Sequence, residues 1–185
     1  MGISFVIIGI VVLLVLWIIT TANSITKKKM KAEQAFADVD VFLTQRYDLI
    51  PNLVSTVKGY SKHEKETFEA VVKARNAAVK ATDMNDKIDA DNTVTEAIGK
   101  LFALAEAYPE LKANENFVKL QDSLESVEKD LVGARRYFNA AAQEYNFATK
   151  VIPNCIVAKL FGYQPMSMFT ATEDARQNVK VDFEN

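Results

Sequence analysis

An uncharged apolar segment, Ile3 to Thr21, begins almost at the N-terminus of this chain and constrains its fold more than any other feature. A helix needs about 20 apolar residues to cross the hydrocarbon core of a bilayer, and this segment has that length. Trp17 lies near its end, where an interfacial aromatic residue is typical. We therefore predict a transmembrane anchor over residues 1–22, with the lipid bilayer as a partner. Its representative residues are Ile3, Phe5, Val11, Leu14, Trp17 and Ile19.

The alternative for this segment is a cleaved signal peptide. Such peptides carry a basic N-terminal region and a shorter apolar core of about 7–15 residues. Here Met1 and Gly2 precede the apolar segment, and neither is basic. We therefore expect the segment to be retained as an anchor.

A cluster of lysines follows the apolar segment, and no lysine or arginine precedes it. Basic residues next to a transmembrane helix mark its cytoplasmic side. The pattern predicts a single-pass protein of the cell (inner or cytoplasmic) membrane, with the N-terminus outside and the C-terminal domain in the cytoplasm. The same lysines could also contact anionic lipid headgroups. This topology signal consists of Lys27, Lys28, Lys29 and Lys31.

The rest of the sequence has the composition of an all-α domain. It contains few of the turn-forming residues that an all-β domain needs, since the chain has 6 glycines and 4 prolines. A net charge of −2 gives no basic face, so we expect no nucleic-acid partner. Cys155 is the only cysteine, which rules out an intrachain disulfide.

Apolar periodicity predicts a first helix from the membrane to about Lys58, because apolar residues recur at steps of 3 and 4. No helix breaker lies between the anchor and Ile50, so the anchor could continue directly into this helix. Pro51 either kinks the helix or starts a new one at its first position. Gly59 suits the C-cap.

Two shorter helices are predicted from their N-terminal signals. Ser61 to Glu64 matches a capping box, which would open a second helix ending near Thr82. The acidic stretch 83–92 is expected to be a loop. Thr93 to Glu96 matches another capping box and would open a third helix, which Pro109 ends.

The fourth predicted helix runs from Phe117 to Ile152, with apolar residues in a heptad register typical of a coiled coil. The chain is therefore expected to be all-α: a transmembrane helix continuing into an antiparallel up-and-down four-helix bundle with long first and last helices. The bundle would be cytoplasmic and cover residues 23–152. Residues 153–185 would fold back on the bundle or toward the membrane.

The unequal helix lengths suggest a homo-oligomer. Because the middle helices are shorter, apolar residues on the membrane-proximal part of the long pair would be exposed, and exposed apolar stripes usually mark interfaces. The expected oligomer seam is Phe36, Val39, Phe42, Phe138, Tyr145 and Phe147.

Polar residues on the same helices form a second candidate set. Buried charges must be paired, so these residues could build a network that fixes the bundle register. Alternatively they could line a polar groove for a peptide or small ligand. The set is Arg46, Asp48, Asn52, Arg75, Arg135 and Asn139.

We find no pattern that indicates catalysis, a metal or a cofactor. His63 is the only histidine, which excludes a two-histidine zinc motif. The acidic stretch 83–92 lacks the glycine and glutamate of an EF-hand loop. Cys155 has no base near it in the sequence. We predict that the chain is not an enzyme.

Several segments together resemble the LemA family of bacterial membrane proteins. They are Gln45–Val54, Val57–Tyr60, His63–Glu64, Ala105–Asn114, Ala134–Asn139, Glu144–Asn146, Ala158–Gly162 and Val179–Phe183. The chain departs from the family pattern at Gln45, where Arg is usual, and at Phe138–Ala140. The resemblance implies an N-terminal transmembrane helix, an antiparallel helical bundle and a bacterial inner-membrane location. It implies no activity.

Two functions are compatible with these features. The first is a membrane-anchored helical scaffold or protein-interaction protein that self-associates at the membrane surface. The second is a lipid-binding or membrane-shaping protein that acts through the juxtamembrane lysines and the aromatic C-terminal segment, Ile156 to Phe169.

Overall fold

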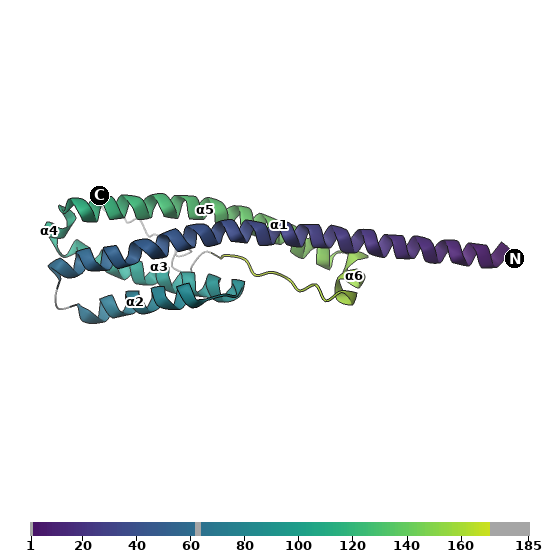
Figure 1. The fold of residues 1–185 in the computed structure, drawn as a ribbon, viewed down its shortest axis with the longest axis horizontal. Helices are drawn as coiled ribbons and strands as arrows, with labels where there is room; N and C mark the ends of the chain where they lie inside the picture. Colours follow the sequence, from purple (N-terminus) through teal and green to yellow (C-terminus); the bar gives the residue numbers. More distant parts are fainter. Residues whose placement is uncertain (1, 62–63, 171–185) are drawn as a thin grey trace, which may run out of the picture. The chain divides into compact units, whose positions relative to one another are not determined.

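The structure is a computed structural model that describes residues 2–61 and 64–170. Over these residues the chain is helical, without strands (Figure 1). The helices are α1 (Gly2–Tyr60), α2 (Lys65–Lys80), α3 (Met84–Glu106), α4 (Pro109–Lys112), α5 (Glu115–Lys150) and α6 (Asn154–Leu160). His63 and residues 171–185, which belong to the sequence-based predictions, lie outside the described residues.

The chain divides into two compact units. The first unit comprises Met1–Leu49 and Lys119–Ser167, and the second comprises Ile50–Val118 and Met168–Asn185. The long helices α1 and α5 contribute to both units.

Helix α1 joins the apolar N-terminal segment to the first helix of the domain, as the absence of a breaker before Ile50 predicted. Pro51 lies inside the helix and starts no new one. A proline removes one backbone hydrogen bond. Ile50, Leu53 and Val57 are buried within the second unit, and this burial keeps the turns around Pro51 helical.

The prediction that Gly59 forms the C-cap of this helix is wrong. Gly59 lies within α1, which ends at Tyr60. Among the described residues, the glycine with positive φ is Gly162, at 71°, after α6. There the Tyr163 amide donates to the Ala158 carbonyl at 3.0 Å and the Gly162 amide donates to Lys159 at 3.3 Å. This is the Schellman pattern, which reverses the chain after α6.

The first unit is held by the packing of α1 against α5. Phe36 and Phe138 meet edge to face, with ring centroids 5.2 Å apart. Val39, Leu43 and Leu131 are buried in the same core. Burial of this kind contributes about 1.5–3 kcal/mol per large apolar side chain.

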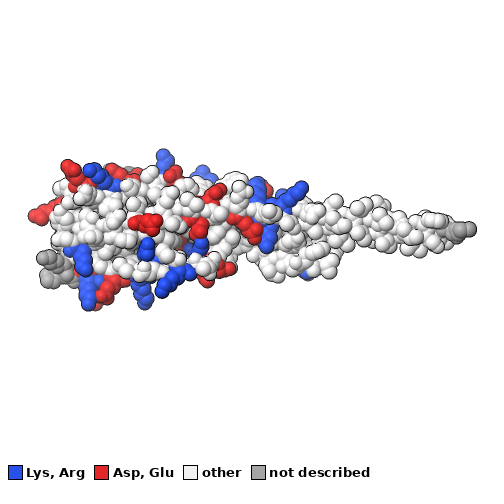
Figure 2. Space-filling view, in the orientation of Figure 1, with Lys and Arg blue, Asp and Glu red and all other residues white. Residues whose placement is uncertain are grey.

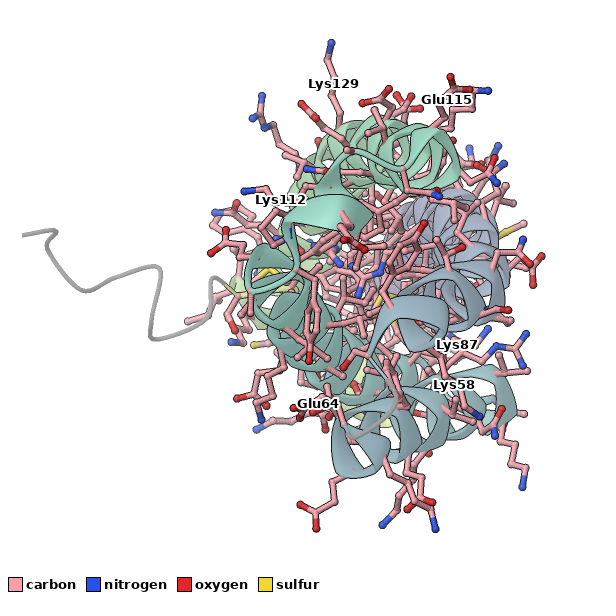
Figure 3. The ribbon with its side chains drawn as sticks, turned by 90° about the vertical axis from the view of Figure 1, so that its left-hand side faces the viewer. Lys58, Glu64, Lys87, Lys112, Glu115 and Lys129 are labelled. Carbon is pink, nitrogen blue, oxygen red and sulfur yellow. The ribbon has the colours of Figure 1, made fainter. Side chains whose placement is uncertain are left out.

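In the second unit, α2 packs against α3. The end of α1 is tied to the connection around α4 by two side-chain hydrogen bonds. Ser61 Oγ donates to the Tyr108 hydroxyl at 3.2 Å, and Asn114 Nδ2 donates to the Tyr60 hydroxyl at 2.8 Å. Lys112, at the end of α4, and Glu115, at the start of α5, point outward into solvent (Figure 3).

Both predicted capping boxes are wrong. Helix α2 begins at Lys65 with Glu64 as its N-cap and no side-chain cap. Helix α3 begins at Met84, capped by Asp83 Oδ1, which accepts from the Asn85 amide at 2.8 Å. The acidic stretch expected as a loop is therefore helical, because Ile88 and Val94 share its buried face.

Candidate functional site

The end of the apolar segment meets the C-terminal part of the first unit in one small core, which we call the juxtamembrane cluster. Its buried members come from α1, α5 and α6, and the chain after α6 covers them. The cluster consists of Ile25, Tyr145, Ala148 and Ala158, with Tyr163 and Met166 packed against it.

Hydrogen bonds fix the chain after α6 onto the other helices. The Tyr163 hydroxyl lies 2.6 Å from Thr26 Oγ1 and donates to the Ala22 carbonyl at 3.3 Å. The Asn146 side chain pairs with the backbone of Met166: its Nδ2 donates to the carbonyl and its Oδ1 accepts from the amide, each at 2.8 Å. The Asn146 side chain thus satisfies both backbone polar groups of Met166, as a neighbouring β-strand would.

Tyr145 is the ionisable residue at the centre of this cluster. Its hydroxyl donates to the Gln164 carbonyl at 2.7 Å. Burial, followed by the nearby Tyr163 phenol and Glu33 carboxylate, raises the pKa of Tyr145 above 10.0. The phenol is therefore neutral and able to donate at physiological pH.

The predicted topology lysines also make ion pairs within the first unit. Glu144 of α5 lies 3.3 Å from Lys31 Nζ and 3.9 Å from Lys28 Nζ. Lys29 pairs with Glu33 at 3.4 Å, one turn along α1. Exposed pairs such as these contribute at most about 1 kcal/mol each. No sequence pattern indicated this pairing role for Glu144.

The predicted anchor residues lie in the N-terminal part of α1. Ile3, Phe5, Val11, Leu14 and Ile19 are exposed, whereas Trp17 is half-buried. Figure 2 shows no charged atoms on the visible face of this part of α1. Among the described residues, α1 alone is long and apolar enough to cross a membrane, and its apolar window has no buried residue. The core helix of a soluble protein would be mostly buried.

Most residues of the expected oligomer seam are buried. Phe36, Val39, Phe138 and Tyr145 are buried within the first unit and Phe42 is half-buried. The expectation that these residues are exposed was wrong, because α1 and α5 cover each other along this length. Phe147 is exposed, as expected.

The predicted polar set is divided by the structure. In the first unit, Arg46 is 1% exposed, and its Nη1 donates to Glu128 Oε2 at 2.9 Å. Arg135 Nη1 donates to the other oxygen of Glu128 at 3.4 Å. Sequence reasoning missed Glu128, although two buried-face arginines require an acid between them.

The other members of the polar set lie elsewhere. Asp48 and Asn52 are exposed, and Asn139 is half-buried. Arg75 belongs to the second unit, where its Nη1 donates to Asn76 Oδ1 at 3.4 Å.

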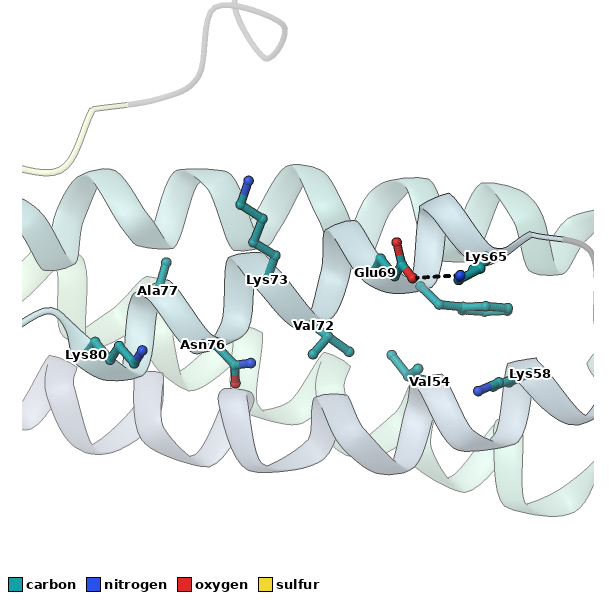
Figure 4. Close-up of a pocket in the computed structure, with 10 residues that line it drawn as sticks. Val54, Lys58, Lys65, Glu69, Val72, Lys73, Asn76, Ala77 and Lys80 are labelled. Carbon is teal, nitrogen blue, oxygen red and sulfur yellow. Dashed lines mark ion pairs between the residues drawn. The ribbon is translucent and has the colours of Figure 1, made fainter.

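The second unit contains a groove between the end of α1 and α2, which we call the α1–α2 groove. It has a volume of about 800 Å³. Figure 4 shows Val54 of α1 opposite Val72 of α2 on its floor, with Lys58 and Lys80 on either side. Val72 is exposed. This groove was not predicted from the sequence, because its floor comes from two helices.

The rim of the α1–α2 groove is basic. Lys65, Lys73 and Lys80 come from α2 and Lys58 from α1. Glu69 is the acidic residue among those lining it, and its carboxylate pairs with Lys65 at 3.5 Å. The groove thus combines an apolar floor with an excess of positive charge.

Within the described residues, no three His, Cys, Asp or Glu side chains are grouped as a metal site would need. Cys155 lies in α6, half-buried and free.

Comparison with known proteins gives a family and two relatives. The profile described as "LemA family" matches residues 35–183. Protein LemA of Metamycoplasma hominis is 21% identical over 159 residues, which cover 85% of this chain and 72% of that protein. Magnetosome protein MamQ of Magnetospirillum gryphiswaldense is 29% identical over 82 residues, or 44% of this chain. The matched region spans 30% of the MamQ chain.

Proposed function

Since the chain belongs to the LemA family, we propose that it is a membrane-anchored helical scaffold that holds a partner protein at the membrane surface and carries out no chemical step. The observation that carries this proposal is the α1–α2 groove, with its apolar floor and lysine rim. Apolar grooves of this kind accept an amphipathic helix from a partner.

The charge of the groove selects the partner's chemistry. Lys58, Lys73 and Lys80 would attract acidic residues beside the apolar face of the docked helix. Complementary charge of this kind increases specificity and the association rate more than affinity. The proposed occupant is therefore an acidic amphipathic helix.

Photo-crosslinking tests this function in cells. A photoreactive amino acid replaces Val72 in the groove, and a control replaces Val118, which is also exposed in the second unit. An adduct of defined mass should form at Val72 and not at Val118, and Lys73→Glu with Lys80→Glu should abolish it. No adduct at Val72, or one that survives both charge reversals, would contradict the proposal.

The arrangement of the domain is also part of this proposal. We propose that α1, α2, α3 and α5 are the four helices of an antiparallel up-and-down bundle. It is supported by the packing of α1 against α5 in the first unit and of α2 against α3 in the second. The domain would lie in the cytoplasm, as the lysines after the apolar segment suggest.

Self-association remains a proposal, now with a different surface. Val41 and Tyr137 are each 55% exposed and line one shallow groove between α1 and α5, together with Phe42. Light scattering of the full-length protein in mild detergent tests it. An assembly that Val41→Asp and Tyr137→Asp dissociate would support this surface, and a monomer at micromolar concentration would exclude it.

A further inference from the structure

Helix α6 is apolar on two opposite faces. Val157 and Ala158 are 1% and 3% exposed and pack onto the first unit. Ile156 and Leu160, on the outer face, are 62% and 70% exposed. A helix in water normally turns a polar face outward. Ile156 and Leu160 on the outer face of α6 are therefore suited to an apolar environment.

Exposed apolar residues also flank the helix in the sequence. Ile152, just before α6, is 85% exposed, and Phe161, just after it, is 54% exposed. A contiguous apolar patch on a protein surface marks contact with another protein or with a membrane.

The position of α6 identifies the membrane as the occupant. The chain after α6 is bonded through Tyr163 to Ala22 and Thr26 of α1. Thr26 lies five residues beyond Thr21, the last residue of the apolar segment, or about 7.5 Å along the helix at about 1.5 Å per residue. The polar layer of each leaflet is about 5–8 Å thick. Tyr163 therefore lies at the depth of the lipid headgroups.

Burial along α1 supports the same depth. Thr21 is 8% exposed, and Trp17 and Ile18 are half-buried, whereas the side chains before them are exposed. The first unit thus packs against the last turn of the apolar segment (Figure 1). In a bilayer, that turn and its covering would lie at the boundary between headgroups and acyl chains.

The charge of this segment suits a lipid surface. From residue 150 to residue 167 the chain contains Lys150 and Lys159 and no acidic residue. Both lysines are exposed. Their long side chains can reach anionic headgroups while the apolar side chains enter the lipid.

We propose that α6 is an interfacial membrane helix, which inserts Ile156, Leu160 and Phe161, with Ile152, into the same leaflet that α1 leaves. The anchor and α6 then hold the first unit to the bilayer at two points. A single spanning helix leaves a domain free to rotate and tilt, and the second contact fixes its orientation. The sequence-based alternative of lipid binding is thereby assigned to α6, with the juxtamembrane lysines in a supporting role.

Depth-dependent fluorescence quenching tests this inference on the full chain in lipid nanodiscs. Trp17 is the only tryptophan, so Trp17→Phe provides a tryptophan-free background. Leu160→Trp is placed in that background, and Val118→Trp, exposed in the second unit, is the matched control. Lipids brominated on the acyl chain near the headgroup act as the quencher.

The expected result is a blue-shifted emission of Leu160→Trp that brominated lipid quenches about as strongly as the native Trp17. Val118→Trp should keep a water-exposed spectrum and resist the quencher. Ile156→Trp provides a second position if Leu160→Trp fails to fold. A spectrum typical of water at both positions, without quenching, would overturn the proposal.

A second copy of the chain is the competing occupant of the patch. With one copy per nanodisc, quenching by lipid should persist, because the bilayer covers α6. A blue shift that disappears at one copy per disc, and that brominated lipid does not quench, would assign the patch to a protein contact and overturn the membrane assignment.

Discussion

The hydroxyl of Tyr163 lies 2.6 Å from Thr26 Oγ1, which connects two positions 137 residues apart in the sequence. Thr26 is in the second turn of α1 after the apolar segment, and Tyr163 follows the Schellman turn that ends α6. Together with the bond from the Tyr163 hydroxyl to the Ala22 carbonyl, this contact ties the chain after α6 to one position along α1. The proposed lipid contact of α6 depends on this position.

Removing this contact should destabilise the first unit. Tyr163→Phe keeps the ring but loses the bonds to Thr26 and to the Ala22 carbonyl. At about 1 kcal/mol per hydrogen bond, a loss of about 1–2 kcal/mol is expected. Thermal unfolding of the full-length protein in detergent measures it. Tyr137→Phe is the control. Because Tyr137 is exposed, this substitution should change the melting temperature little.

The raised pKa of Tyr145 predicts loss of stability in alkali. Burial holds the pKa of this phenol above its unfolded value of 10.0, so the folded state keeps a proton that the unfolded state releases. The stability from this group is complete below pH 10 and falls as the pH rises above it. Melting temperatures between pH 8 and 11.5 should therefore fall more steeply for the native chain than for Tyr145→Phe. Parallel curves would contradict this explanation.

Glu128 should matter more for stability than its partial exposure suggests. Glu128→Gln removes the carboxylate that pairs with both Arg46 and Arg135, and the Arg46 guanidinium stays buried. Breaking a fully buried pair costs about 3–5 kcal/mol. Because the Glu128 side chain is 42% exposed, we expect a smaller loss, on the order of 2 kcal/mol.

Chemical denaturation of Glu128→Gln and of Glu125→Gln, an exposed neighbour on α5, measures this difference. The same experiment decides between the two readings of the polar set. A structural network requires a lower unfolding free energy for Glu128→Gln. An unchanged unfolding free energy would favour a ligand groove around Arg46 instead.

Much of the fold follows from periodicity in the sequence, but local helix ends do not. The apolar segment and the heptads of α5 are long enough for their average to outweigh local signals. The capping box predicted at Thr93 is a short motif. The helix instead begins earlier, at Met84, because Ile88, Asp91 and Val94 share a buried face. Thr93 Oγ1 instead donates to the Asp89 carbonyl at 3.2 Å, inside the helix.

The candidate sites were less predictable because they depend on contacts between distant segments. Arg46 was recognised as a buried cation, but its acid, Glu128, is 82 residues away. Most residues expected to form an oligomer seam are buried, because apolar residues of α1 and α5 cover each other. The segment Ile156 to Phe169 was a candidate for lipid contact, but which face of α6 is exposed depends on the packing that buries Val157 and Ala158.

The last prediction concerns the side of the membrane on which the domain lies. In a Cys155→Ser background, Ser123→Cys places a thiol on the exposed face of α5, and Gly2→Cys places one before the apolar segment. Because the lysines follow that segment, a membrane-impermeant maleimide should label Gly2→Cys in intact cells and Ser123→Cys only after the cells are opened. The reverse pattern would place the domain outside the membrane.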